Sequence, residues 1–132
     1  MGNYSSQANE GCLAMSDKER LKSIKHQLAV LIRRGNRRVP FGEEYPKKWW
    51  FGEVIDPRSH KYFTPTGAWD FIAEKLEEPG TRIREVVLEK PEGRKAYELR
   101  IPIQKNMIYI KIHFGGKGNT VIGRSFHYSE ER

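Results

Sequence analysis

The stretch Met107-Ile108-Tyr109-Ile110-Lys111-Ile112-His113-Phe114 places an isoleucine or phenylalanine at every second position. Side chains in a β-strand point alternately to the two faces of a sheet, so this pattern predicts a strand with one apolar face. Tyr109, Lys111 and His113 fall on the opposite face. The apolar face needs a layer to cover it, which leaves the polar face for solvent or a ligand.

Three further runs of the sequence also alternate, and turn sequences separate them. They are residues 82–90, 94–103 and 120–128, with turns at Pro91-Glu92-Gly93, at residues 104–106 and at residues 115–119. Short connections of this kind join antiparallel neighbours. We therefore expect a meander of four antiparallel strands in the second half of the chain.

Two helices are predicted before these strands. Ser16 and Glu19 form a capping-box sequence, and leucine and isoleucine residues then recur at helical spacing as far as Gly35. Thr64-Pro65 is a good helix start, and Pro79-Gly80 ends the second apolar stripe. The expected fold class is α+β, with two helices packed on one face of a four-stranded antiparallel sheet.

Residues 37–63 are rich in proline and aromatic side chains, and two interpretations of them stay open. The aromatic residues can fix a proline-rich connector to the core, or they can stack on unpaired bases beside Lys47 and Lys48. A short strand is expected within residues 50–54.

Composition limits the class of protein. The chain has 132 residues, which suits one domain over residues 16–132 after a flexible tail over residues 1–15. Cys12 is the single cysteine, and the start of the chain shows no signal sequence. No apolar run approaches the roughly 18 residues that a membrane span needs. We expect a cytoplasmic protein without a membrane segment, a metal or another cofactor, because the His, Cys and Asp residues show no ligand spacing.

The net charge of +7 favours an anionic partner, first a nucleic acid and second an acidic protein. Part of this charge is concentrated at the end of the first helix, in Arg33, Arg34, Arg37 and Arg38. Basic residues at a helix C-terminus complement the helix dipole, which accounts for one or two of them. The cluster is therefore either a phosphate-binding patch or a solvated turn.

The polar strand faces carry the groups that metal-free cleavage of RNA needs. One group must take the proton of the 2′-hydroxyl, a second must protonate the leaving oxygen, and cations must stabilise the charge on phosphorus. Histidine suits the acid and an arginine fork fits the phosphate. We expect catalysis from His127, Arg100, Tyr109, Lys111, Glu98 and Arg124, and RNA binding from Arg33, Arg34, Arg37, Arg38, His113 and Tyr128.

The pairing of the last two strands decides which of these side chains meet. If Phe114 lies opposite Thr120, Tyr109 lies opposite Ser125 and His127 comes to the same face. Arg124 then points to the other face unless a bulge re-aims it. The same polar groups could also form an ordinary solvated sheet face, and a non-catalytic RNA- or DNA-binding module is the alternative function.

The sequence resembles the RelE-like ribonuclease toxins of bacterial toxin–antitoxin systems, and within them the motility quorum-sensing regulator family. The resemblance rests on Leu99-Arg100-Ile101-Pro102, on residues 108–112 and on Val121-Ile122-Gly123-Arg124-Ser125-Phe126-His127-Tyr128. It implies a RelE-like fold, cleavage of mRNA or tRNA, and inhibition by a cognate antitoxin protein. Arg100, Tyr109 and His127 stand at the family's arginine, tyrosine and terminal basic positions. The chain departs from the family in ending on histidine and in lacking a clear counterpart of its catalytic lysine and glutamine.

Overall fold

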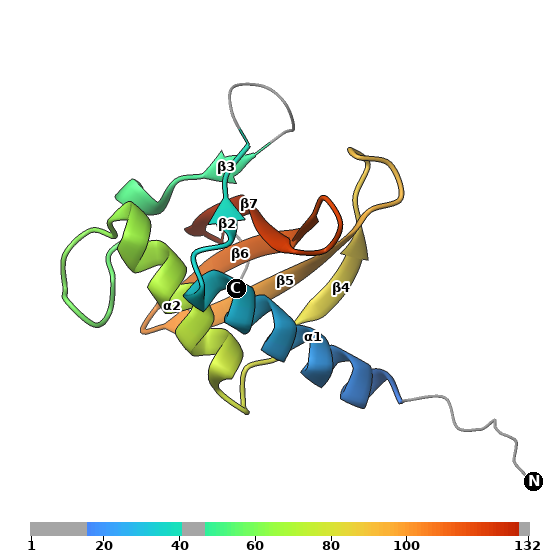
Figure 1. The fold of residues 1–132 in the computed structure, drawn as a ribbon. Coiled ribbons are helices and arrows are strands. Elements are labelled where there is room, and N and C mark those ends of the chain that lie inside the picture. The colour runs from blue at the N-terminus through green and yellow to red at the C-terminus, as the bar shows by residue number, and fades with distance from the viewer. Residues whose placement is uncertain (1–15, 41–46, 130–132) are drawn as a thin grey trace, which may run out of the picture.

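The computed structural model describes residues 16–40 and 47–129, and it shows an α+β fold. Two helices lie across one face of a mixed sheet of six strands (Figure 1). The predicted tail over residues 1–15 lies outside the described residues. Within the described ranges, neither helix has the length and apolar character that crossing a membrane requires.

Both helices begin where their capping sequences predict. α1 spans Asp17–Arg33, and its N-cap Ser16 accepts a hydrogen bond from the backbone N–H of Glu19 at 3.2 Å. Gly35 follows the helix with a φ of 83°, a conformation that glycine adopts without strain. α2 spans Pro65–Glu77, and its N-cap Thr64 accepts from the N–H of Gly67 at 2.9 Å.

Four strands pair antiparallel in chain order, as the alternating runs predict. They are β4 (Arg84–Val87), β5 (Lys95–Ile103), β6 (Asn106–Gly115) and β7 (Thr120–Tyr128). Two further strands, β2 (Arg37–Arg38) and β3 (Lys48–Trp49), pair parallel with β7. The sheet as a whole is therefore mixed, and the purely antiparallel four-stranded sheet was an incomplete prediction. Each added strand has two residues, too few to show an alternating pattern.

The expected short strand within residues 50–54 is wrong. Phe51–Glu53 forms a 3₁₀ helix, η1, and the strand lies just before it in β3. Trp49 of β3 packs against Trp69 of α2 and Phe126 of β7, with ring centroids 5.0 and 5.6 Å apart. This aromatic cluster anchors the connector to the core between helices and sheet, as one of the two interpretations of residues 37–63 expects.

The pairing of β6 with β7 differs from the predicted register. Gly115, not Phe114, lies opposite Thr120, and the ladder shifts by one residue between Lys111 and Ile112. Lys111 pairs with Ser125 and Ile112 pairs with Gly123, so Arg124 is the extra residue of a β-bulge.

Gly123 offers a test of this packing. A Cβ at Gly123 would lie 2.7 Å from atoms of the Trp49 ring, which the aromatic cluster holds in place. Gly123→Ala is expected to lower the free energy of unfolding by about 1–3 kcal/mol, because the ring or the strand must move. Denaturant unfolding measures the change.

Gly80→Ala is the matched control, because a Cβ there meets no heavy atom within 4 Å. Its effect is expected to stay below about 1 kcal/mol. Equal stabilities of the two variants would contradict the close approach of β3 and β7.

Candidate functional site

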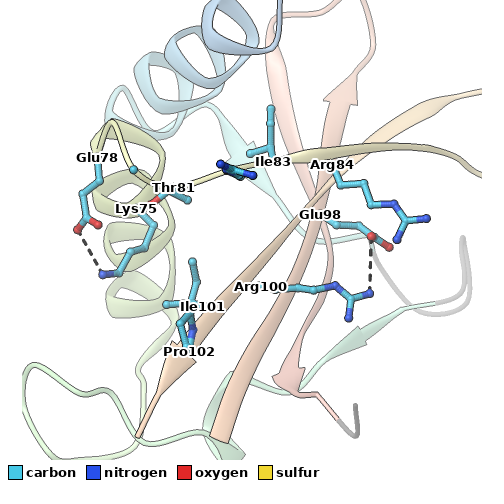
Figure 2. A pocket seen from close by; sticks show the side chains of 11 residues that line it. Lys75, Glu78, Thr81, Ile83, Arg84, Glu98, Arg100, Ile101 and Pro102 are labelled. Carbon is cyan, nitrogen blue, oxygen red and sulfur yellow. Dashed lines mark hydrogen bonds and ion pairs between the residues drawn. The ribbon is translucent and has the colours of Figure 1, made fainter. Parts of the chain in front are cut away.

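The face of the sheet that the helices leave uncovered carries a continuous row of polar side chains. Figure 2 shows Arg84, Glu98 and Arg100 pointing to this side, away from α1 and α2. The register of the sheet adds side chains from β6 and β7, and ring contacts add one from the segment after β3. We call this set the open face: Lys48, Trp50, Arg84, Glu98, Arg100, Tyr109, Lys111, Ser125 and His127.

A carboxylate and a phenol form the centre of the open face. The Tyr109 hydroxyl donates to Glu98 Oε2 at 2.5 Å. Burial is the main cause that raises the pKa of Tyr109, and the hydrogen bond and charge of Glu98 raise it further, so the phenol keeps its proton. Glu98 Oε1 is buried without a hydrogen-bond partner among the described residues, and Arg100 Nη2 lies 3.9 Å from it. This oxygen is therefore the free acceptor of the carboxylate.

Cations surround this single carboxylate. Arg84 lies opposite Glu98 on β4, and the Arg100 guanidinium lies 5.2 Å from the centre of the Tyr109 ring. Lys111 is opposite Glu98 on β6 and half-buried. Burial, followed by the charge of Arg124, lowers the pKa of Lys111, and Glu98 opposes that shift. The excess of positive charge suits an anion such as a phosphate.

His127 stands between two aromatic rings of the open face. Its imidazole lies 5.4 Å from the Tyr109 ring and 5.6 Å from the Trp50 ring, centroid to centroid. His127 Nδ1 is 2.8 Å from the backbone oxygen of Tyr128. A carbonyl oxygen can only accept, so Nδ1 carries a proton, and Nε2 is the ring nitrogen left to contact a substrate.

The other end of this face is covered, and it holds two predicted site residues. His113 and Arg124 are 2% and 3% exposed. Arg124 Nη1 donates to His113 Nε2 at 3.1 Å, and Arg124 Nη2 donates to the backbone oxygen of Lys90 at 2.9 Å. The turn after β4 therefore lies over the bulge. Arg124 and His113 sit beneath the surface, where they support the site and do not reach an RNA strand.

The four arginines of the predicted cluster make different contacts in the structure. Arg33 binds the Glu77 carboxylate of α2 at 2.9 Å, and Arg37 stacks over the Trp69 ring at 5.8 Å. Arg38 is exposed at the sheet edge opposite Ile122 of β7, and Arg34 is exposed at the end of α1. The four arginines do not form one phosphate-binding patch.

Tyr128 also differs from its predicted role. Its hydroxyl accepts a hydrogen bond from the backbone N–H of Ile55 at 3.1 Å, and its ring packs against the core. Tyr128 lies opposite Ile108, whose side chain is fully buried, so it belongs to the helix-facing side of the sheet. Tyr128 holds the segment around Ile55 in place and is not part of the open face.

Sequence reasoning did not assign Trp50, Lys48 or Arg84 to the site. Trp50 is 46% exposed, and Lys48 Nζ lies 5.8 Å from the centre of its ring. The aromatic-rich segment signalled base stacking only in general terms, because its parallel pairing with β7 was not visible. The alternating pattern of β4 could have identified Arg84, because Arg84 pairs with Glu98 of β5 and lies on the same face of the sheet.

Comparison of the chain with protein-family models, curated proteins and solved structures gave no significant match.

The buried His113 predicts a pH dependence of stability. Burial is the main cause that lowers its pKa from the ordinary 6.5 to about 4, and neighbouring arginines add to the shift. The unfolded chain binds a proton near the ordinary pKa of histidine, whereas the folded chain binds it only near pH 4. The free energy of unfolding is therefore expected to fall by at most about 3 kcal/mol as the pH drops through this window.

Denaturant unfolding of the parent and of His113→Gln over this pH range measures the effect. The variant lacks the titrating ring, so its stability should fall less steeply than that of the parent, while the carboxylates titrate in both proteins. Identical slopes would contradict the buried, neutral state of His113.

Proposed function

We propose that the protein is an endoribonuclease that cleaves single-stranded RNA without a metal ion, and that the open face is its active site. The observation that carries the proposal is the row Glu98–Tyr109–His127, which crosses three adjacent strands with cations on both sides. It offers an acceptor for one proton, a donor for another, and positive charge between them.

The reaction is a transesterification within the RNA. The 2′-oxygen attacks the neighbouring phosphorus, the bond to the 5′-oxygen breaks, and a 2′,3′-cyclic phosphate and a 5′-hydroxyl result. Glu98 takes the proton of the 2′-hydroxyl on Oε1, because Tyr109 already occupies Oε2. Oε1 is buried in the free protein, so the RNA must displace the neighbouring Arg100 side chain to reach it. His127 Nε2 gives a proton to the leaving 5′-oxygen.

The spacing of the row suits this assignment. Glu98 and His127 lie on β5 and β7, on either side of Tyr109. Strands that are two positions apart in a sheet have backbones roughly 10 Å apart, which leaves room for a phosphate over Tyr109. Base and acid then act on opposite sides of the phosphorus, while Arg100 and Lys111 stabilise the charge that develops on its oxygens.

The toxin function that the sequence resemblance implies is part of the proposal, and an α+β fold with two helices on one sheet face supports it. A ribonuclease of this class acts on mRNA or tRNA and requires an inhibitor in the cell that makes it. The partner would be an antitoxin that covers the open face, and acidic side chains would complement its charge.

A non-catalytic RNA-binding module is the second candidate, and Trp50 favours it. An exposed indole beside a lysine is a typical platform for base stacking, and it needs no chemistry. This candidate predicts the same binding surface and the same salt dependence of affinity, but no cleavage. Cleavage in EDTA, tested without and with ribosomes, separates the two.

His127→Ala tests the proposed acid. The cleavage rate of single-stranded RNA in EDTA is expected to fall about 10²-fold to 10⁴-fold, because the leaving oxygen loses its proton donor. Affinity for 2′-O-methylated RNA, which lacks the nucleophile, should change less than about tenfold, since the phosphate contacts remain.

His26→Ala, at an exposed position of α1, is the matched control and should cleave at the parental rate. Arg100→Ala should reduce both rate and affinity, as expected for a group that binds phosphate. Parental cleavage by folded His127→Ala would remove histidine from the mechanism and favour the binding module.

A further inference from the structure

A cavity of about 750 Å³ lies at the edge of the sheet, beside the open face (Figure 2). It is bounded by the end of α2, the connector from α2 to β4, and the second half of β5. The cavity exists because β4 starts at Arg84, opposite Glu98, so that β4 does not extend along β5 beyond this point. Its volume falls in the range of small-ligand pockets, which are large enough for a nucleotide.

The segment between α2 and β4, which forms one wall of the cavity, is fixed in place by contacts with the rest of the protein. Lys25 of α1 donates to the backbone oxygen of Glu78 at 2.9 Å and also to that of Thr81. Ile83, just before β4, is buried in the core. The side of the cavity opposite β5 is therefore held in position before any ligand arrives, which reduces the cost of binding.

The cavity carries an excess of positive charge. Its carboxylates are Glu78, which pairs with Lys75 at 3.2 Å, and Glu98, whose Oε2 accepts from Tyr109 at 2.5 Å and whose Oε1 lies 3.9 Å from Arg100 Nη2. Arg82 and Arg84 line the cavity and have no ion-pair partner among the residues that the structure describes. Two guanidinium groups without a carboxylate partner are suited to a phosphate.

The cavity is continuous with the open face, because Arg84, Glu98 and Arg100 belong to both. We propose that the cavity binds a nucleotide next to the scissile phosphate of a single-stranded RNA, with Arg82 and Arg84 on its phosphate. This inference rests on the proposed function and extends it: the RNA strand crosses the sheet from Trp50 to the free edge of β5. Arg82 is then a residue for substrate binding and takes no part in the chemistry.

Arg82→Gln tests this proposal, with Lys22→Gln as the control. Both residues are exposed, and both substitutions lower the net charge by one, but Lys22 lies on α1 and does not line the cavity. The probe is 2′-O-methylated oligouridylate of about four and about twelve nucleotides, lengths that bracket common single-strand site sizes.

Arg82→Gln should weaken binding of the longer oligonucleotide about 3- to 10-fold and reduce its salt slope by about one. In this variant, the affinity gained on lengthening the RNA should be smaller than in the parent. With unmodified oligouridylate as substrate, KM for cleavage should rise while kcat stays unchanged. Lys22→Gln should change these quantities less than about twofold.

The outcomes distinguish this inference from the proposed function. If RNA is not cleaved but Arg82→Gln weakens binding of the longer RNA as expected, the cavity binds a nucleotide of a bound RNA and the ribonuclease proposal fails. If RNA is cleaved and Arg82→Gln behaves like Lys22→Gln, the ribonuclease stands and the cavity is not part of the RNA path. A fall in kcat with unchanged KM would also overturn the assignment, since it would place Arg82 in the chemistry.

Discussion

The β-bulge at Arg124 decides which side chains of β7 reach the open face. From the hairpin to Gly123, β7 pairs with β6 in a register that continues to Ile112. If this register continued, His127 would lie opposite Ile108 and face the core. One extra residue in β7 instead brings His127 opposite Tyr109 and turns the Arg124 side chain towards His113. The bulge therefore determines both the position of His127, the proposed acid, and the direction of the Arg124 side chain.

The bulge in turn needs partners for a buried guanidinium. Burying an unpaired charge is strongly unfavourable, so the contacts of Arg124 with His113 and with the Lys90 carbonyl are essential to this conformation. Burial is the main cause that lowers the pKa of His113, and the neutral ring can accept from Arg124 at Nε2. The covered end of the face thus fixes the strand geometry, while Arg84, Arg100 and Trp50 at the open end stay exposed. Arg124 additionally lowers the pKa of Lys111, which links the two ends electrostatically.

Much of the fold follows from local sequence. The capping residues of α1 and α2 and the alternation of four strands act over a few residues and are visible directly. Strands β2 and β3 could not be predicted, because each is short and exists only through pairing with β7. The predicted and observed registers place His127 on the same face, but they do so for different reasons: the hairpin register is shifted, and the bulge restores the face.

For the candidate site, the sequence predicts which side chains share a face of the sheet, but it does not predict which of them are buried. Strand parity alone placed Glu98, Arg100, Tyr109 and Lys111 on one face, and the structure brings them together there. The role of a histidine or an arginine depends on burial, which the sequence pattern does not reveal. The sequence pattern puts both His113 and His127 on the polar face, but one is buried against Arg124 and the other lies between the Tyr109 and Trp50 rings.

Histidine and tryptophan side chains provide the most direct test that RNA binds the open face. We expect 2′-O-methylated RNA to shift the NMR signals of the His127 imidazole and the Trp50 indole, whose ring centroids lie 5.6 Å apart. The signals of His26 on α1, His60 in the loop before α2 and Trp69 in the core should stay in place. Shifts at His26 or His60 with none at His127 and Trp50, under conditions where RNA is bound, would contradict the account.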